Sequence, residues 1–158
     1  MKSWGSEVGG ESYVTSGKPS RYRRYLAISV TILRRTDQPG APTVANNLED
    51  QKWETFWVFD DLRSKQELPE MAVVDFQFIP VSGDANLSGF INEINGLDYK
   101  VERYDDGITV QISTRPIALS AERIWFHEKL FTVIGQKYGF SPDGWGFLGV
   151  ERDGVSSN

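Results

Sequence analysis

The chain has 158 residues and a formal net charge of −5; 39% of its residues are hydrophobic and 25% are charged, which suits one globular domain with an extension. It contains no run of roughly 18 apolar residues that could span a membrane and no apolar block near its start that would act as a secretory signal. Without cysteine it cannot form disulfides, thiolate metal sites or a cysteine nucleophile, and we expect a cytoplasmic protein that does not contact a membrane.

The first 70 residues predict a leader followed by an extension. Residues 1–20 are rich in glycine and serine and show no hydrophobic period, so we expect a flexible leader. Alternating apolar residues over 26–33 predict a half-buried strand. The aromatic run 53–59 predicts a further strand, and residues 60–67 predict a short helix. We therefore expect residues 21–70 to form an extension with one or two extra strands, packed on the main domain.

The second half of the chain has a more regular pattern. Val74, Phe76 and Phe78 alternate with polar residues and predict a strand. A helix follows, with Asp84 as its cap and Gly96 as its stop. Apolar residues recur in it three and four positions apart, at Leu87, Phe90, Ile91 and Ile94.

Two strands, residues 99–104 and 108–114, are predicted to form a hairpin around Asp106-Gly107. Asp-Gly favours a two-residue type I′ turn, because both central residues need positive φ. The resulting register pairs Asp105 with Ile108, Val101 with Ile112 and Arg103 with Val110. It gives the hairpin one apolar and one polar face, as in an antiparallel sheet that is covered on one side.

The end of the chain completes the pattern. Ser120 is predicted to cap a long helix that runs to Tyr138 and stops at Gly139, and residues 145–150 predict the last strand. The order is strand, helix, strand, strand, helix, strand. This order predicts an α+β fold of ferredoxin-like βαββαβ type, with two helices on one face of an antiparallel sheet.

The most distinctive segment is Tyr138-Gly139-Phe140-Ser141-Pro142-Asp143-Gly144-Trp145-Gly146. It resembles the Tyr-Asp-Gly-Trp-Gly signature that closes the domain of the ribonuclease E inhibitor RraB family, although Ser141-Pro142 stands where a Glu-Tyr-type pair is usual. The elements upstream occur in the same order: a strand like residues 74–78, a helix, a segment like residues 99–102, and a strand ending near Arg115-Pro116. The resemblance covers residues 71–151, with 152–158 as a tail. It implies a regulatory protein that binds ribonuclease E and alters its activity.

The signature residues Asp143, Gly144, Trp145 and Gly146 also have a physical interpretation. The glycines permit a tight turn, and Asp143 can bond the backbone amides of that turn. Trp145 can either pack inward, so that the turn locks the last strand onto the long helix, or offer a large surface to a partner.

Acidic residues form a second candidate partner-binding site. The first 40 residues hold seven Lys/Arg against three acids, so the rest of the chain carries a net charge of −9. Asp98, Glu102, Asp105 and Asp106 are expected around one end of the predicted hairpin. They could dock an Arg-rich protein segment, or they could simply be solvated.

Two alternatives to a ribonuclease regulator remain. The stretch Arg21-Tyr22-Arg23-Arg24-Tyr25 interleaves cations with aromatic rings and could contact RNA. However, RNA-recognition modules stack bases on aromatic residues of the central strands. The outward positions here are expected to be polar: Asp75, Gln77, Thr109 and Gln111. The other alternative is an immunity or interaction protein that shares the fold but has a different target.

Nothing in the sequence predicts an enzyme. His127, the single histidine, lies in the apolar line of the long helix, which indicates a partly buried structural role. Glu122 and Glu128 are six positions apart and so lie on different faces of that helix. We therefore expect no catalytic residue, no metal site and no cofactor.

Overall fold

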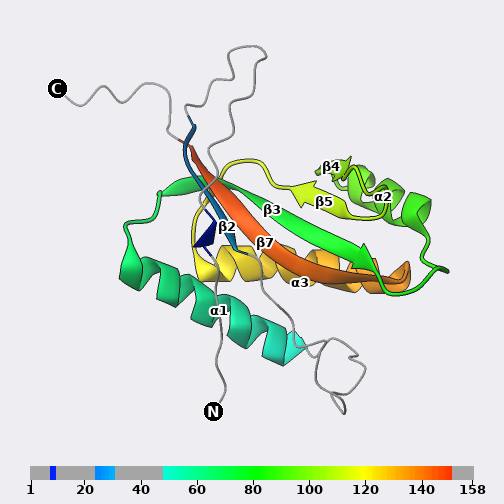
Figure 1. Ribbon diagram of the computed structural model, residues 1–158, viewed down its shortest axis with the longest axis horizontal. Coiled ribbons are helices and arrows are strands. Elements are labelled where there is room, and N and C mark those ends of the chain that lie inside the picture. Colours follow the sequence, from blue (N-terminus) through cyan, green and yellow to red (C-terminus); the bar gives the residue numbers. More distant parts are fainter. Residues whose placement is uncertain (1–7, 10–23, 31–47, 151–158) are drawn as a thin grey trace.

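The computed structural model describes residues 8–9, 24–30 and 48–150 (Figure 1). The predicted leader over residues 1–20 lies outside this part of the chain except for β1, and the predicted tail over 152–158 lies outside it entirely. In chain order the described elements are β1 (Val8–Gly9), β2 (Arg24–Val30), α1 (Leu48–Lys65), β3 (Met71–Pro80), α2 (Leu87–Gly96), β4 (Lys100–Arg103), β5 (Val110–Ser113), β6 (Ile117–Ala118), α3 (Ala121–Lys137) and β7 (Phe140–Val150).

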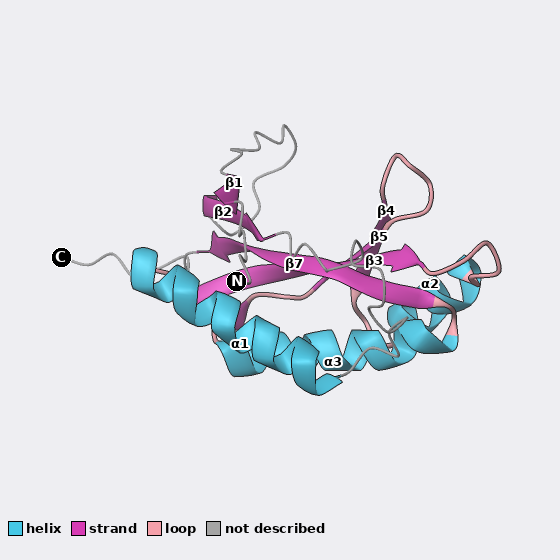
Figure 2. Cartoon of the chain, turned by 60° about the horizontal axis from the view of Figure 1, so that its bottom comes forward, coloured by secondary structure: helices cyan, strands magenta, loops and turns pink. Residues whose placement is uncertain are grey.

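The described strands form one antiparallel sheet in the order β1-β2-β7-β3-β5-β4, and β6 also pairs with β3. All three described helices lie on the same face of this sheet (Figure 2). The predicted α+β class with an antiparallel sheet is thus confirmed. The strand order β7-β3-β5-β4, with α2 after β3 and α3 after β5, is compatible with a ferredoxin-like arrangement.

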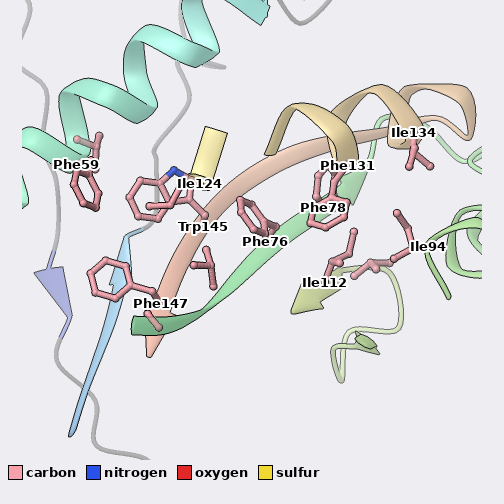
Figure 3. Close-up of a cluster of buried hydrophobic side chains, with 14 of the residues drawn as sticks. Phe59, Phe76, Phe78, Ile94, Ile112, Ile124, Phe131, Ile134, Trp145 and Phe147 are labelled. Atoms are coloured by element: carbon pink, nitrogen blue, oxygen red, sulfur yellow. The ribbon is translucent and has the colours of Figure 1, made fainter. Parts of the chain in front are cut away.

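The core lies between the sheet and the helices (Figure 3). β3 buries every second residue from Ala72 to Phe78, as a strand covered on one face requires. Phe76 packs edge-on against Phe131 of α3, with ring centroids 5.3 Å apart, and Phe78 packs in the same way against Phe90 of α2 at 5.4 Å. One continuous cluster therefore joins the central strand to the helix layer.

α1 corrects the prediction for the extension. Residues 53–59, expected as a strand, lie within this helix, and residues 60–65 of the expected short helix form its end. Trp53 and Trp57, whose aromatic side chains led to the predicted strand, are exposed on the outer side of the helix. The buried positions recur at helical spacing and begin with polar residues: Gln51, Thr55, Val58, Phe59 and Leu62.

The hairpin has the predicted register, in which Val101 lies opposite Ile112, but a different turn. Of the two residues at its tip, Gly107 has positive φ (73°) and Asp106 does not. The amide of Gly107 donates to the carbonyl of Tyr104 at 2.9 Å. The Asp106 carboxylate accepts bonds from the amides of the two residues after Gly107. These side-chain bonds stabilise a four-residue loop in place of the type I′ turn.

The helix ends match the prediction in α3 but not in α2. Ser120 caps α3 by accepting a bond from the amide of Arg123 at 3.2 Å, and Gly139 ends it with a φ of 80°. α2 is capped by Asn86 and not by Asp84, and the left-handed residue after it is Asp98 (φ 65°) and not Gly96. Asn86 can cap α2 because its side chain accepts a bond from the amide of Gly89, and aspartate adopts the left-handed conformation of Asp98 more readily than most residues with a side chain.

A buried polar cluster joins α1 to α3. The Gln51 amide donates to Glu128 Oε1 and to the Thr132 hydroxyl, both at 2.9 Å, and the Thr55 hydroxyl donates to the other Glu128 oxygen. All four side chains are buried. Because a buried donor without an acceptor is costly, these bonds hold the two helices in one relative position.

We predict that Glu128→Ala lowers the free energy of unfolding by about 2–4 kcal/mol, because it leaves the Thr55 hydroxyl and part of the Gln51 amide buried without an acceptor. Urea denaturation measures the change. Lys129→Ala, at the exposed neighbouring position, should change it by no more than about 0.5 kcal/mol. Equal effects of the two substitutions would contradict the role of the cluster.

Candidate functional site

The signature segment lies in a bulged strand and not in the predicted tight turn. β7 begins at Phe140, five residues earlier than expected, and pairs with β3 along its whole length. Gln77 lies opposite Gly144, whereas Phe78 lies opposite Pro142, so Asp143 is an extra residue in β7. Pro142 lies directly beside the bulge, and among the described residues β2 pairs with β7 only from Trp145 onward, so no described strand requires the missing amide hydrogen on that side.

The glycine of the bulge is required by its backbone. Gly144 has a φ of 152°, which L side chains rarely adopt. Asp143 was expected to bond the amides of a turn, but its carboxylate accepts no hydrogen bond within the described part of the chain. The bulge is thus produced by glycine and by pairing with β3.

Trp145 is a core residue. Its side chain is 2% exposed and stacks on Phe147, with ring centroids 6.4 Å apart (Figure 3). Its Nε1 is buried and has no hydrogen-bond partner among the described residues. The indole therefore acts through its volume, and its predicted alternative role as a partner contact has no exposed surface to support it. The neighbouring Gly146 is half-buried and lies opposite Asp75 of β3.

The acidic residues predicted as one cluster are separated. Asp98 precedes β4, whereas Asp105 and Asp106 follow it, so they lie at opposite ends of that strand. Asp98 pairs with Arg115, and Glu102 pairs with Lys100 at 2.7 Å. These exposed pairs contribute little to stability.

The carboxylate of Asp106 is engaged in hydrogen bonds within its own turn. Its carboxylate bonds the hydroxyl of Thr109 as well as the backbone, and these bonds hold the pKa of Asp106 below its ordinary value. Asp105 is exposed in the same loop. Of the four predicted acids, Asp105 makes no side-chain hydrogen bond or ion pair with a described residue, so its carboxylate is the most suitable for contact with a partner.

On the face of the sheet away from the helices, the predicted positions Asp75, Gln77 and Gln111 are polar, whereas Val73 and Ile79 of β3 on the same face are apolar. Gln77 donates to the Tyr104 hydroxyl, which donates in turn to Gln111, each at 2.7 Å. Ser113 donates to Asp75 at 2.5 Å. The predicted basic contact residues Arg21, Tyr22 and Arg23 lie outside the described residues, and Arg24 is the first residue of β2.

His127 lies in an aromatic environment on α3. Its ring is 8% exposed and lies 5.9 Å from that of Tyr99 and 6.1 Å from that of Phe131. Nδ1 lies 2.8 Å from the carbonyl of Arg123, so Nδ1 carries the hydrogen. Burial lowers the pKa of His127 below its ordinary value of 6.5 and outweighs the bond to the Arg123 carbonyl, which raises it; the Arg123 charge adds a smaller lowering.

Exposed aromatic residues on the helix layer were not predicted as a site. Trp53 and Trp57 stack on the outer side of α1, with centroids 6.3 Å apart, and are 57% and 39% exposed. Phe126 on α3 is 64% exposed. The sequence spacing of Trp53 and Trp57, one helical turn apart, was the available signal, but it counts only once the segment is known to be helical.

A groove lies beside these residues, between the C-terminal half of α1, residues 66–70 and the start of α3. It has a volume of about 610 Å³. Its lining is apolar at Phe56, Phe59, Leu68, Pro69, Leu119 and Ala121 and polar at Asp60, Arg63, Gln66, Glu67, Glu70, Ser120 and Glu122. Within the part of the chain that the structure describes, no three acidic or histidine side chains are grouped so that they could hold a metal ion. No helix there is long and apolar enough to cross a membrane.

No family model and no curated protein matches this chain.

We predict that Trp145→Ala lowers the free energy of unfolding by about 3–5 kcal/mol, because it removes a large buried side chain. Trp145→Phe should cost less, about 1–2 kcal/mol, because Nε1 has no bond to lose. Asp143→Ala should change stability by no more than about 0.5 kcal/mol. Chemical denaturation tests all three, and a neutral effect of Trp145→Ala would contradict the core assignment.

We further predict that His127 makes the fold less stable in weak acid. Because its pKa is lower in the folded than in the unfolded state, its contribution is fully present above pH 6.5 and is lost as the pH falls from 6.5 toward the folded pKa. Urea midpoints at neutral and weakly acidic pH measure this loss. His127→Gln should reduce the difference between the two midpoints, and an unchanged difference would mean that carboxylates cause it.

Proposed function

We propose that this protein is a non-catalytic regulatory binding protein of the cytoplasm. In this proposal residues 71–151 form a RraB-like domain with ferredoxin-like topology, and residues 21–70 form an extension packed on it. The partner is a basic protein segment, and the resemblance of the signature makes ribonuclease E the first partner to test. The protein acts by occupancy, because it covers a surface of the nuclease or changes what the nuclease recruits.

The observation that carries this proposal is an acidic surface that also exposes large aromatic rings. The chain after residue 40 has a net charge of −9, and Trp53, Trp57 and Phe126 are exposed on the helix layer. Aromatic side chains are enriched where proteins contact each other, and negative charge speeds association with basic partners.

The polar face of the sheet favours a protein partner over RNA. Gln77, Tyr104 and Gln111 bond one another there, and Tyr104, directly after β4, is the single aromatic side chain among the described residues of this face of the hairpin. A base-stacking surface would need several rings, and the negative charge of the body repels phosphates.

The test is direct binding to purified ribonuclease E, together with the rate at which that enzyme cleaves an RNA substrate. We expect saturable binding and a changed cleavage rate. The affinity should fall as salt increases, because opposite charges steer the association. Asp105→Lys, which leaves the turn-forming Asp106 intact, should weaken binding by about two- to tenfold if the hairpin loop contributes to the contact.

A matched variant separates this proposal from RNA binding. Replacing Arg21, Arg23 and Arg24 with glutamine should leave ribonuclease E binding in place. If the protein instead binds single-stranded RNA, with an affinity that falls steeply with salt and is lost in this variant, the RNA-contacting alternative replaces the proposal. Absence of any effect on ribonuclease E would remove that enzyme as the partner.

A further inference from the structure

The groove between α1 and α3, which we call the α1–α3 groove, has an apolar floor. Phe59 is buried beneath it, and Phe56, Leu68 and Leu119 are half-buried around it. Its volume of about 610 Å³ is within the range of sites that hold a small molecule or several side chains. The floor can therefore pack against the aliphatic part of an inserted side chain.

The rim of the groove is strongly acidic. It carries four carboxylates and one guanidinium, and Asp60 is paired with that guanidinium, from Arg63, at 2.9 Å. The side chains of Glu67, Glu70 and Glu122 are exposed and make no hydrogen bond or ion pair in the described part of the chain. These three glutamates around the apolar floor thus form no ion pair with a described residue, although Arg63 lies on the rim and Lys52 Nζ lies 5.9 Å from the ring centroid of Phe56.

We propose that the α1–α3 groove docks a Lys- or Arg-bearing, extended segment of a partner protein; this inference rests on the proposed function and locates its binding site. The hydrocarbon stem of the inserted residue packs on Phe56 and Leu68, and its charged end pairs with the glutamates of the rim. A phosphate-bearing ligand would meet the same carboxylates and be repelled.

The tryptophan pair extends this docking surface. Trp57 lies one helical turn before Asp60, so the stacked rings of Trp53 and Trp57 continue from the rim along the outer side of α1. A second cation of the same segment can lie over an indole face, the strongest of the cation–π acceptors. The groove sets the position of the segment and the ring pair adds contact area.

The experiment uses the full chain and a dye-labelled peptide of alternating arginine and glycine, with fluorescence anisotropy as the readout. A matched peptide has glutamate in place of arginine. We expect the arginine peptide to bind at low salt, the glutamate peptide not to bind, and the triple variant Glu67→Gln, Glu70→Gln, Glu122→Gln to bind roughly tenfold more weakly.

The control is a second triple variant with the same change in net charge at exposed positions outside the groove: Asp84→Asn, Asp98→Asn, Glu102→Gln. It should bind the arginine peptide within about twofold of the original chain, because a rim contact is local. Equal weakening in both triple variants would show that only the net charge matters and would overturn the groove assignment.

Other outcomes also decide the question. No binding of the arginine peptide overturns the groove proposal, whereas the ribonuclease E measurement above decides the proposed function independently. A dimer detected by sedimentation that the groove variant dissociates would assign the groove to a second copy of the chain. Binding of lysine or arginine as free amino acids with the affinity of the peptide would assign it to a small cationic ligand. Both of these results would overturn docking of a partner segment.

Discussion

The apolar face of β3 has to be covered, and most of the structure follows from how the chain covers it. β7 and β5 flank β3 and extend its apolar surface to both sides. α3 lies against the centre through Phe131, and α2 lies at one end through Phe90. α1 packs along α3 and adds Val58, Phe59 and Leu62 to the same buried cluster. The helix that carries the exposed tryptophans is thus held in place by burial of its apolar residues in the common core.

The sequence predicts those elements whose hydrophobic period agrees with their final environment. β3 alternates and α3 has a cap and a stop, and both appear where the pattern placed them. α1 could not be predicted, because its buried stripe starts with Gln51 and Thr55 while its largest apolar residues face outward. The start of β7 was missed for a different reason: Pro142 indicates a turn, whereas the bulge at Asp143 accommodates it within a strand.

The candidate site depends on packing that no local pattern encodes. Asp98 and Asp106 are close in sequence but lie at opposite ends of β4. The acids of the α1–α3 groove come from three segments, namely α1, residues 66–70 and the start of α3, and converge only when α1 lies along α3. Glu122 and Glu128 were correctly assigned to different faces of one helix. Their different surroundings, a charged rim and a buried cluster, are consequences of where α1 lies.

The polar cluster between α1 and α3 also selects the alignment of the two helices. Gln51 and Thr55 are one turn apart, and both donate to Glu128. If α1 slid by one turn, about 5.4 Å, so that Phe59 took the place of Thr55, one carboxylate oxygen would face a ring in place of a hydroxyl donor. An interface made only of leucines would tolerate such a slip more easily. Glu128 therefore fixes the position of α1 along α3, and the shape of the groove at the far end of α1 depends on that position.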